Sequence, residues 1–273
     1  MSKVKEECLD QKELKKMFEA QKNVVFMGKL RVDQFRKKST TKNTPPTVYR
    51  YMPFSRAMEW FTKKKIIFVN PEIWEDPFET RFLKGYCSNK RHKRKQLACL
   101  CVTTEHGENE AAAWRSFDKD GKHNLVQVTL DLGVLIKAVN DFAQKCGATV
   151  YVKAADYSFT SEQIKSSGKK VFLPNSTVIG DKDFIKLMCI KRRAFAFEKE
   201  MRILIYGGKL PFDGNILRIP YKGELIRTLK ICPNPNPSEF IVADLVKEIV
   251  KKGVGKTRVE RSCLYDDPPI FRF

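Results

Sequence analysis

The sequence predicts an α+β fold, with one compact domain at residues 46–273 behind a basic helical extension at residues 1–45. From Thr47 onward, short runs of β-branched and aromatic residues alternate with segments whose apolar residues recur at helical spacing. A packed core is expected because 42% of the 273 residues are hydrophobic and 19 are Phe. No Gly/Ser-rich linker and no internal repeat divides the chain, which favours a single domain.

The elements follow in order along the chain. The extension has a polar, helical pattern and ends in the flexible, basic stretch KKSTTKNTPP. Clusters of β-branched and aromatic residues predict strands in TVYRYM, KKIIFVNP, QLACLCVTT, HNLVQVTLDL, ATVYVKAADY, EKEMRILIYG, ILRIPY, ELIRTLKICP and TRVERSCLY. Apolar residues at helical spacing predict helices in SRAMEWFTKK, LGVLIKAVNDFAQKC, residues 182–195 and near VADLVKEIVKKG. The stretch WEDPFE is predicted to form a turn-rich loop.

The charge of the chain favours a polyanionic partner, above all nucleic acid. The 52 Lys and Arg exceed the 32 Asp and Glu, which gives a formal net charge of +20. Residues 1–50 hold 13 basic and 6 acidic side chains, and residues 80–104 hold seven basic side chains and no acidic one. The alternative for both segments is a solvated surface. The predicted phosphate contacts are Lys90, Arg91, Lys93, Arg94, Lys95, Lys191, Arg192 and Arg193.

Membrane, secreted and metal-binding classes find no support in the sequence. No apolar run approaches the roughly 18 to 20 residues of a membrane span, and the start MSKVKEECLDQKELKKMF lacks the apolar stretch of a secretory signal. We therefore expect a cytoplasmic protein with no membrane partner. The eight Cys include no C-x-x-C pair, and the three His do not fall at ligand spacing with them. This pattern predicts buried, reduced thiols and no metal site.

The sharpest local signal for chemistry is FEKEMR, residues 197–202. In a strand, Glu198, Glu200 and Arg202 would share one face, and Met201 would lie on the other. Two carboxylates beside an arginine suit a site that stabilises a positively charged transition state. A salt-bridged face of the strand in solvent explains the same residues equally well.

Aromatic residues mark further candidate positions. An arginine beside aromatic rings on the first predicted strand of the domain, in TVYRYM, can hold a phosphate. The alternative is an aromatic core face with the arginine at the surface. Other candidates end the strand KKIIFVNP and lie in AAAWRSFDKDG. The candidates are Tyr49, Arg50, Tyr51, Asn70, Trp114 and Ser116.

The order of these motifs resembles that of a known family. Y-R-Y, N-P, W-x-D-P-F, a tryptophan before a glycine, F-E-K-E-x-R-I-L and a closing V-x-x-S-x-L-Y follow one another over residues 47–265. This series resembles a bacterial family of domains of unknown function found in toxin and phage-defence loci. That family is similar to ADP-ribosyltransferases, including CmdT-like mRNA ADP-ribosyltransferases. The resemblance implies a split β-sheet core with flanking helices, NAD as co-substrate, a nucleic-acid acceptor (RNA rather than DNA) and an antitoxin as a further partner.

The resemblance also implies roles for the candidate residues. In ADP-ribosyltransferases, a glutamate from a later strand hydrogen-bonds the nicotinamide ribose and stabilises the positive charge that develops as nicotinamide leaves. Glu200 is the first candidate for this carboxylate and Glu198 the second, while the six aromatic-motif residues would bind NAD. Two other hypotheses stay open: a nucleic-acid-binding protein that has lost the chemistry, and a metal-dependent nuclease using Asp183 with the two glutamates.

Overall fold

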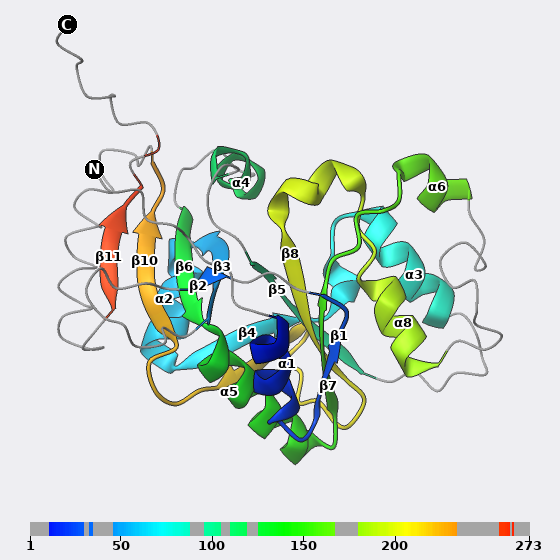
Figure 1. Cartoon of the computed structure of the whole chain (residues 1–273), viewed down its shortest axis with the longest axis horizontal. Coiled ribbons are helices and arrows are strands. Elements are labelled where there is room, and N and C mark those ends of the chain that lie inside the picture. Colours follow the sequence, from blue (N-terminus) through cyan, green and yellow to red (C-terminus); the bar gives the residue numbers. More distant parts are fainter. Residues whose placement is uncertain are drawn as a thin grey trace, which may run out of the picture.

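The computed structural model describes residues 11–29, 33–34, 46–87, 96–104, 110–118, 125–166, 180–233, 257–262 and 264. These residues form a mixed β-sheet with helices packed on its faces (Figure 1). The predicted α+β class is therefore confirmed. None of the helices described is both long and apolar enough to cross a membrane.

Every predicted strand is present, and two strands of the extension were not predicted. The strands are β1 (Val24–Met27), β2 (Asp33–Gln34), β3 (Pro46–Pro53), β4 (Lys65–Val69), β5 (Leu97–Thr103), β6 (Leu125–Asp131), β7 (Thr149–Ala154), β8 (Glu200–Tyr206), β9 (Ile216–Pro220), β10 (Ile226–Ile231) and β11 (Arg258–Arg261). The helices are α1 (Gln11–Glu19), α2 (Phe54–Lys63), α3 (Pro77–Cys87), α4 (Glu110–Phe117), α5 (Leu132–Cys146), α6 (Ser161–Ser166) and α8 (Asp181–Met188). Two 3₁₀ helices are η1 (Pro71–Ile73) and η2 (Arg193–Glu198). The helix predicted near VADLVKEIVKKG lies outside the described residues.

The sheet consists of two blocks that meet at one point. Its strand order is β1-β7-β8-β5-β3-β6-β10-β11, with β2 beside β3, and β4 between β5 and β9. Long registers join β7, β8 and β5, and likewise β3, β6 and β10, whereas β3 and β5 share the single pair Tyr49–Thr103. Thr103 in turn pairs with Glu200 on β8. Tyr49, Thr103 and Glu200 therefore lie in one line across three strands, at the split between the blocks.

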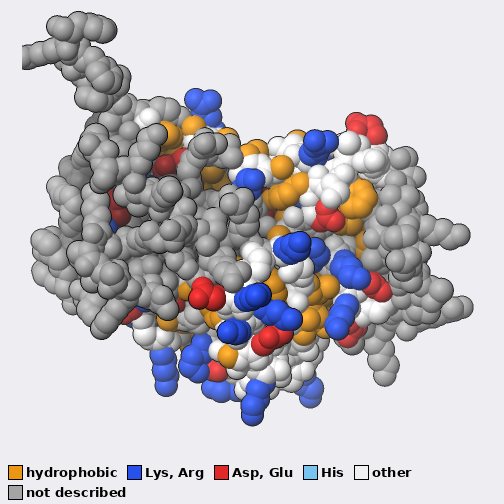
Figure 2. Space-filling model, in the orientation of Figure 1, with side chains coloured by type: hydrophobic (Ala, Val, Ile, Leu, Met, Phe, Trp, Pro, Cys, Tyr) orange, Lys and Arg blue, Asp and Glu red, His pale blue; other side chains and the backbone are white. Residues whose placement is uncertain are grey.

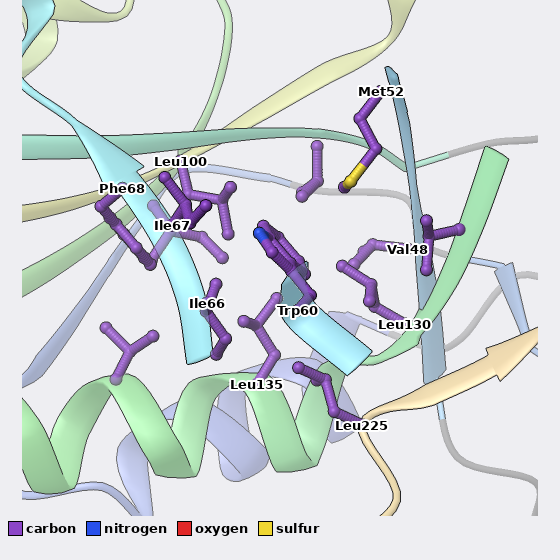
Figure 3. Packing of buried hydrophobic residues seen from close by; sticks show 14 of the residues in the cluster. Val48, Met52, Trp60, Ile66, Ile67, Phe68, Leu100, Leu130, Leu135 and Leu225 are labelled. Carbon is purple, nitrogen blue, oxygen red and sulfur yellow. The ribbon is translucent and has the colours of Figure 1, made fainter. Parts of the chain in front are cut away.

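The larger apolar core lies between the sheet and helices α2 and α5 (Figure 3). Trp60 of α2 is 1% exposed and packs in this core with Leu135 of α5. Helix α5 begins after Asp131, whose carboxylate accepts a hydrogen bond from the amide of Val134 at 3.0 Å. It ends at Gly147, whose φ of 65° suits a residue without a Cβ atom. These two ends position α5 across one face of the sheet.

A second apolar cluster covers the opposite face of the β7–β8–β5 block with α3 and α8 (Figure 1). Alternate residues of β8, such as Ile203 and Leu204, belong to the two different clusters, and every residue of β8 is buried. The alternative that FEKEMR presents a face to solvent is therefore wrong. The five described free cysteines include three that are buried, Cys99, Cys189 and Cys232.

The described part of the N-terminal extension packs against the sheet. Leu14 and Phe18 of α1 are fully buried in the larger core, and β1 pairs in parallel with β7. The ring of Phe18 stacks on Phe26 of β1, with centroids 4.8 Å apart. The domain boundary at residue 46 stays a prediction, but residues 11–29 contribute to the same core as the domain.

Candidate active site

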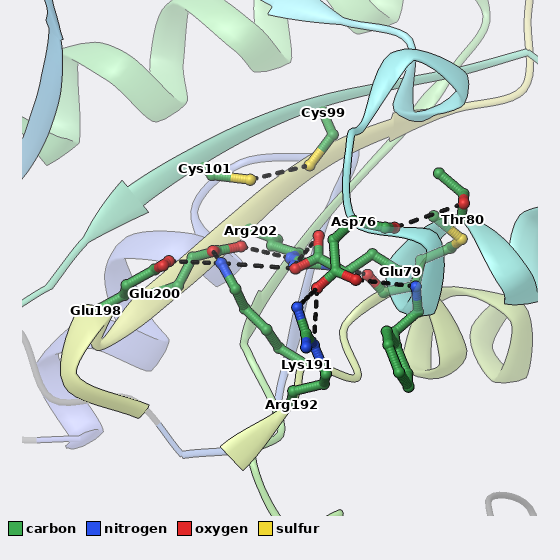
Figure 4. A network of polar contacts seen from close by, with 12 residues as sticks. Asp76, Glu79, Thr80, Cys99, Cys101, Lys191, Arg192, Glu198, Glu200 and Arg202 are labelled. Carbon is green, nitrogen blue, oxygen red and sulfur yellow. Dashed lines mark hydrogen bonds and ion pairs between the residues drawn. The ribbon is translucent and has the colours of Figure 1, made fainter. Parts of the chain in front are cut away.

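Five charged side chains form a buried network on the face of β8 that α3 and α8 cover (Figure 4). None of them is more than 9% exposed, and Arg202 is fully buried. Burying a charge is costly unless the charge is paired and hydrogen-bonded. The five side chains therefore depend on one another. They are Glu79 of α3, Lys191 before η2, Glu198 at the end of η2, and Glu200 and Arg202 of β8.

Glu200 lies at the centre of the network and uses both carboxylate oxygens. Its Oε1 accepts a hydrogen bond from Nε of Arg202 at 2.5 Å, and its Oε2 accepts one from Nζ of Lys191 at 2.6 Å. The same Nζ lies 2.5 Å from Oε2 of Glu198 and 3.6 Å from Oε1 of Glu79. Arg202 also donates to Glu79, at 3.0 Å. Each cation thus bridges carboxylates from different elements.

The segment WEDPFE supplies one side of this network. The ring of Trp74 lies over the guanidinium of Arg202, with its centroid 4.5 Å from Cζ. Asp76 lies just before α3 and pairs with Arg192 at 3.0 Å. The predicted loop is present at residues 74–76 but is wrong from Pro77 onward, because an Asp followed by Pro begins α3 at this point. That helix delivers Glu79, a site residue that the sequence pattern did not single out.

The chain turns sharply between the two glutamates. Lys199 has φ 45° and ψ 45°, in the left-handed region, so that Glu198 ends η2 and β8 starts at Glu200. The prediction that both glutamates lie on one continuous strand face is therefore wrong, although both carboxylates reach Lys191. Thr104 holds the turn, since its amide and its hydroxyl both donate to the carbonyl of Lys199 at 3.0 Å.

The network gives the two glutamates different acidities. Three carboxylates and two cations leave one negative charge. Burial would raise the pKa of Glu200, but Arg202 and Lys191 hold that pKa far below its ordinary value. For Glu198, burial outweighs the attraction of Lys191 and, together with the charge of Glu200, raises the pKa from 4.5 to about 7. Near neutral pH, Glu200 is ionised while Glu198 exchanges a proton.

An aromatic cluster borders the network. Tyr51 stacks on Phe117, with centroids 5.3 Å apart, and meets the ring of Trp114 edge-on at 4.9 Å. The Tyr51 hydroxyl accepts a hydrogen bond from Gln127 at 2.7 Å, and Trp114 donates to Glu110 at 2.9 Å. Tyr51 is buried, which agrees with the alternative prediction that this strand has an aromatic core face. Because α4 contacts both β3 and η2, these rings lie next to η2, which ends at Glu198.

The other four predicted NAD-binding residues do not belong to this aromatic cluster and lie on three different elements or their ends. Tyr49 is half-buried at the split of the sheet. Arg50 donates to the carbonyl of Cys101 and so links β3 to β5 at the same split. Ser116 is half-buried on α4. Asn70 serves a local role, since its side chain caps η1.

The predicted phosphate contacts divide into three groups. Lys191 is buried among three carboxylates, and Arg192 pairs with Asp76. Arg193 is exposed. Of these three side chains, Arg193 is therefore the one that solvent reaches freely. The remaining five predicted contacts lie outside the described residues: Lys90, Arg91, Lys93, Arg94 and Lys95.

The residues of the nuclease hypothesis are engaged elsewhere. Asp183 pairs with Lys186 of the same helix at 2.9 Å, while Glu198 and Glu200 hold Lys191. Within the described ranges, no group of His, Cys, Asp and Glu side chains is arranged to hold a metal ion. The described residues thus offer this hypothesis no site.

Comparisons with known proteins give distant structural likenesses. No protein-family profile matches the chain, and no curated protein matches it by sequence. The chain is similar to the structure of Thermus sp. 2.9 DarT in complex with NAD+, with a TM-score of 0.35 and 10% identity over 80% of this chain and 96% of that chain. DarT in complex with ADP-ribosylated ssDNA gives a TM-score of 0.35 and 11% identity over 80% and 94%. Similarity of this degree leaves the functional inference to the chain's own residues.

Removing the buried arginine should destabilise the protein strongly. We expect Arg202→Leu to lower the free energy of unfolding by about 3–5 kcal/mol, because Glu79 and Glu200 would then share only Lys191. The matched control is Arg218→Leu, since Arg218 also bridges two carboxylates but is 30% exposed. That change should lower the free energy of unfolding much less, because solvent screens an exposed ion pair. Urea unfolding measures the free energy of unfolding of both variants. Equal decreases in the two variants would contradict a buried network.

The left-handed turn should tolerate glycine but not a β-branched residue. We expect Lys199→Gly to change the free energy of unfolding by less than about 1 kcal/mol and Lys199→Ile to lower it by about 1–2 kcal/mol. Lys64, with φ 50° at the end of α2, provides the control. Lys64→Ile should be similarly destabilising, but only Lys199→Ile should shift the titration of Glu198. An identical titration in both isoleucine variants would contradict the role assigned to the turn.

Stability should depend on pH through Glu198. Between pH 4.5 and about 7 the folded protein holds a proton on Glu198 that the unfolded chain has lost. The contribution of Glu198 to the free energy of unfolding therefore falls as pH rises through this window. The free energy of unfolding of Glu198→Gln, measured relative to that of wild type, should therefore be about 2–3 kcal/mol higher at pH 8 than at pH 5. Urea unfolding of both proteins at the two pH values tests this, and a constant difference would contradict it.

Proposed function

We propose that the protein is an NAD-dependent ADP-ribosyltransferase that modifies a nucleic acid. The observation that carries this proposal is the pair of buried glutamates, unequal in acidity, at the split of the sheet. The order of motifs from Y-R-Y to F-E-K-E-x-R supports it, because that order resembles ADP-ribosyltransferases. Further support comes from the register that aligns Tyr49 of the first motif with Glu200 of the last.

Glu200 is proposed to stabilise the departure of nicotinamide. When the bond between C1′ of the ribose and the nicotinamide nitrogen breaks, the nitrogen keeps the electron pair and positive charge spreads over C1′ and the ring oxygen. A fixed carboxylate in a site shielded from water stabilises such charge well. Glu200 stays ionised, and Arg202 and Lys191 hold it in place before any ligand arrives. Tyr49, which is half-buried at the split of the sheet, offers a surface for the ribose and nicotinamide.

Glu198 is proposed to act as the general base toward the acceptor. A nitrogen or oxygen of the acceptor attacks C1′ and must lose a proton as the new bond forms. A carboxyl with a pKa of about 7 is well matched to accept that proton near neutral pH. Two carboxylates whose surroundings drive their pKa values apart suit two separate roles in one reaction.

A nucleic acid is the proposed acceptor because of the formal charge of +20. Several cationic contacts would make such binding steeply salt-dependent. The resemblance in motif order further favours RNA over DNA. It also favours a cytoplasmic role as a toxin or anti-phage effector, with an antitoxin protein as partner. The second candidate function is nucleic-acid binding without chemistry, and the same charge favours it.

Substitution of the two glutamates should affect the reaction differently. With NAD labelled in the adenosine part, we expect wild-type protein to release nicotinamide and label RNA or single-stranded DNA. Glu200→Gln should slow nicotinamide release by at least about 100-fold, since it removes the fixed charge. Glu198→Gln should remove the rise in transfer rate centred near pH 7, because the base works only when ionised. Chromatography of nicotinamide and autoradiography of the separated products measure both effects.

The control is Glu19→Gln, which changes an exposed carboxylate of α1 that pairs with Lys15. This variant should keep wild-type rates. Full activity in the Glu198→Gln, Glu200→Gln double variant would contradict the proposed chemistry. Salt-sensitive oligonucleotide binding without nicotinamide release, unchanged by either substitution, would instead favour the non-enzymatic function.

A further inference from the structure

A basic hollow of about 530 Å³ opens next to the glutamate network. Its charged and polar lining residues are Lys29, Lys153, Asp156, Tyr157, Ser158 and Arg193. Three cations thus face one acid. The hollow comes from segments far apart in the sequence, and of its three cations only Arg193 was among the predicted phosphate contacts.

The three cations of the hollow are available to a ligand. Lys29 and Arg193 are exposed and Lys153 is half-buried. Within the described part of the chain, none of the three forms an ion pair, and the carboxylate of Asp156 accepts a hydrogen bond from the amide of Ser158 at 3.0 Å. The described charges therefore leave a positive balance in the hollow. Figure 2 shows Lys and Arg side chains gathered over the described middle of the face displayed there.

Two contacts connect the hollow to the network. The hydroxyl of Tyr157 accepts a hydrogen bond from the backbone amide of Glu200 at 3.0 Å. Lys153 of β7 is the cross-strand partner of Arg202, so both side chains lie on the same face of the sheet. Helix η2 makes a third link, since it begins at Arg193 in the hollow and ends at Glu198 in the network.

The hollow and the proposed NAD-binding residues of β3 lie beyond opposite edges of β8. In the sheet, β7 adjoins one edge of β8, and β5 followed by β3 adjoins the other. The hollow belongs to the β7 side, whereas Tyr49 and Tyr51 lie on β3. Two ligands could thus approach the glutamates from two sides without competing for the same residues. A transfer reaction needs such an arrangement of donor and acceptor.

We propose that the basic hollow binds backbone phosphates of a single-stranded nucleic acid and leads its bases toward Glu198. The reaction at Glu198 rests on the proposed function, whereas the binding does not. Lys29, Lys153 and Arg193 contact the phosphates. A single strand is the form that fits, because the bases of a duplex are stacked inside it and cannot reach a buried carboxylate. Non-specific single-strand binding commonly combines such a positive groove with nearby aromatic rings.

Binding of labelled 12-nucleotide RNA and DNA strands, measured without NAD, tests this site. The triple variant Lys29→Ala, Lys153→Ala, Arg193→Ala should bind about tenfold more weakly at 0.15 M salt. Its slope of log K against log salt should be shallower by about 2, because three contacts are lost. The matched control removes the same charge at three exposed lysines outside the hollow, Lys145, Lys209 and Lys222. That control should keep the wild-type slope.

A parallel titration with NAD identifies the source of the phosphate. The proposal expects the triple variant to lose strand affinity while its NAD affinity changes less than twofold. Loss of NAD affinity with unchanged strand affinity would overturn it and assign the hollow to the diphosphate of the cofactor. Equal strand affinities in the triple variant and the lysine control, or no strand binding by wild type, would also overturn it. Strand binding that depends on the hollow, without any nicotinamide release, would keep this site and remove the transferase proposal.

Discussion

The contact between Glu200 and Arg202 is the interaction on which the rest of the site depends. Both side chains are buried under α3 and α8, where an unpaired charge would be strongly destabilising. Each then requires further partners, and Lys191 and Glu79 provide them. The network therefore ties α3, the segment before η2, and β8 together. Glu198 lies at the edge of this network, where burial, together with the charge of Glu200, raises its pKa.

This arrangement allows one fold to hold two different carboxylates. The cations fix the position and charge of Glu200, and the left-handed turn at Lys199 brings Glu198 back to the same ammonium group. Thr104 and Tyr157 hydrogen-bond the carbonyl and the amide of the peptide group that joins Lys199 to Glu200, so the split of the sheet and the hollow are both connected to this turn. The polar site is thus part of the buried interior around β8 and does not lie on the surface of the protein.

Much of the fold was predictable from the sequence, but the burial of the site was not. The strands followed from clusters of β-branched residues, yet β1 was missed because the four residues VVFM show no alternation. FEKEMR drew attention to the right charges, while Glu79 lies 123 residues from Arg202 in the sequence and no local period connects them. Lys199 was unpredictable as a turn because non-glycine residues rarely adopt positive φ.

Titration of individual carboxyl groups tests the unequal acidity of Glu198 and Glu200 directly. NMR of ¹³C-labelled glutamate side chains, assigned with Glu198→Gln and Glu200→Gln, follows both groups with and without NAD. Glu198 should titrate near pH 7, Glu200 should stay ionised throughout the range in which the protein is folded, and NAD should shift the Glu198 signal. Ordinary, equal pKa values for the two glutamates, or signals that NAD leaves unchanged, would contradict the account.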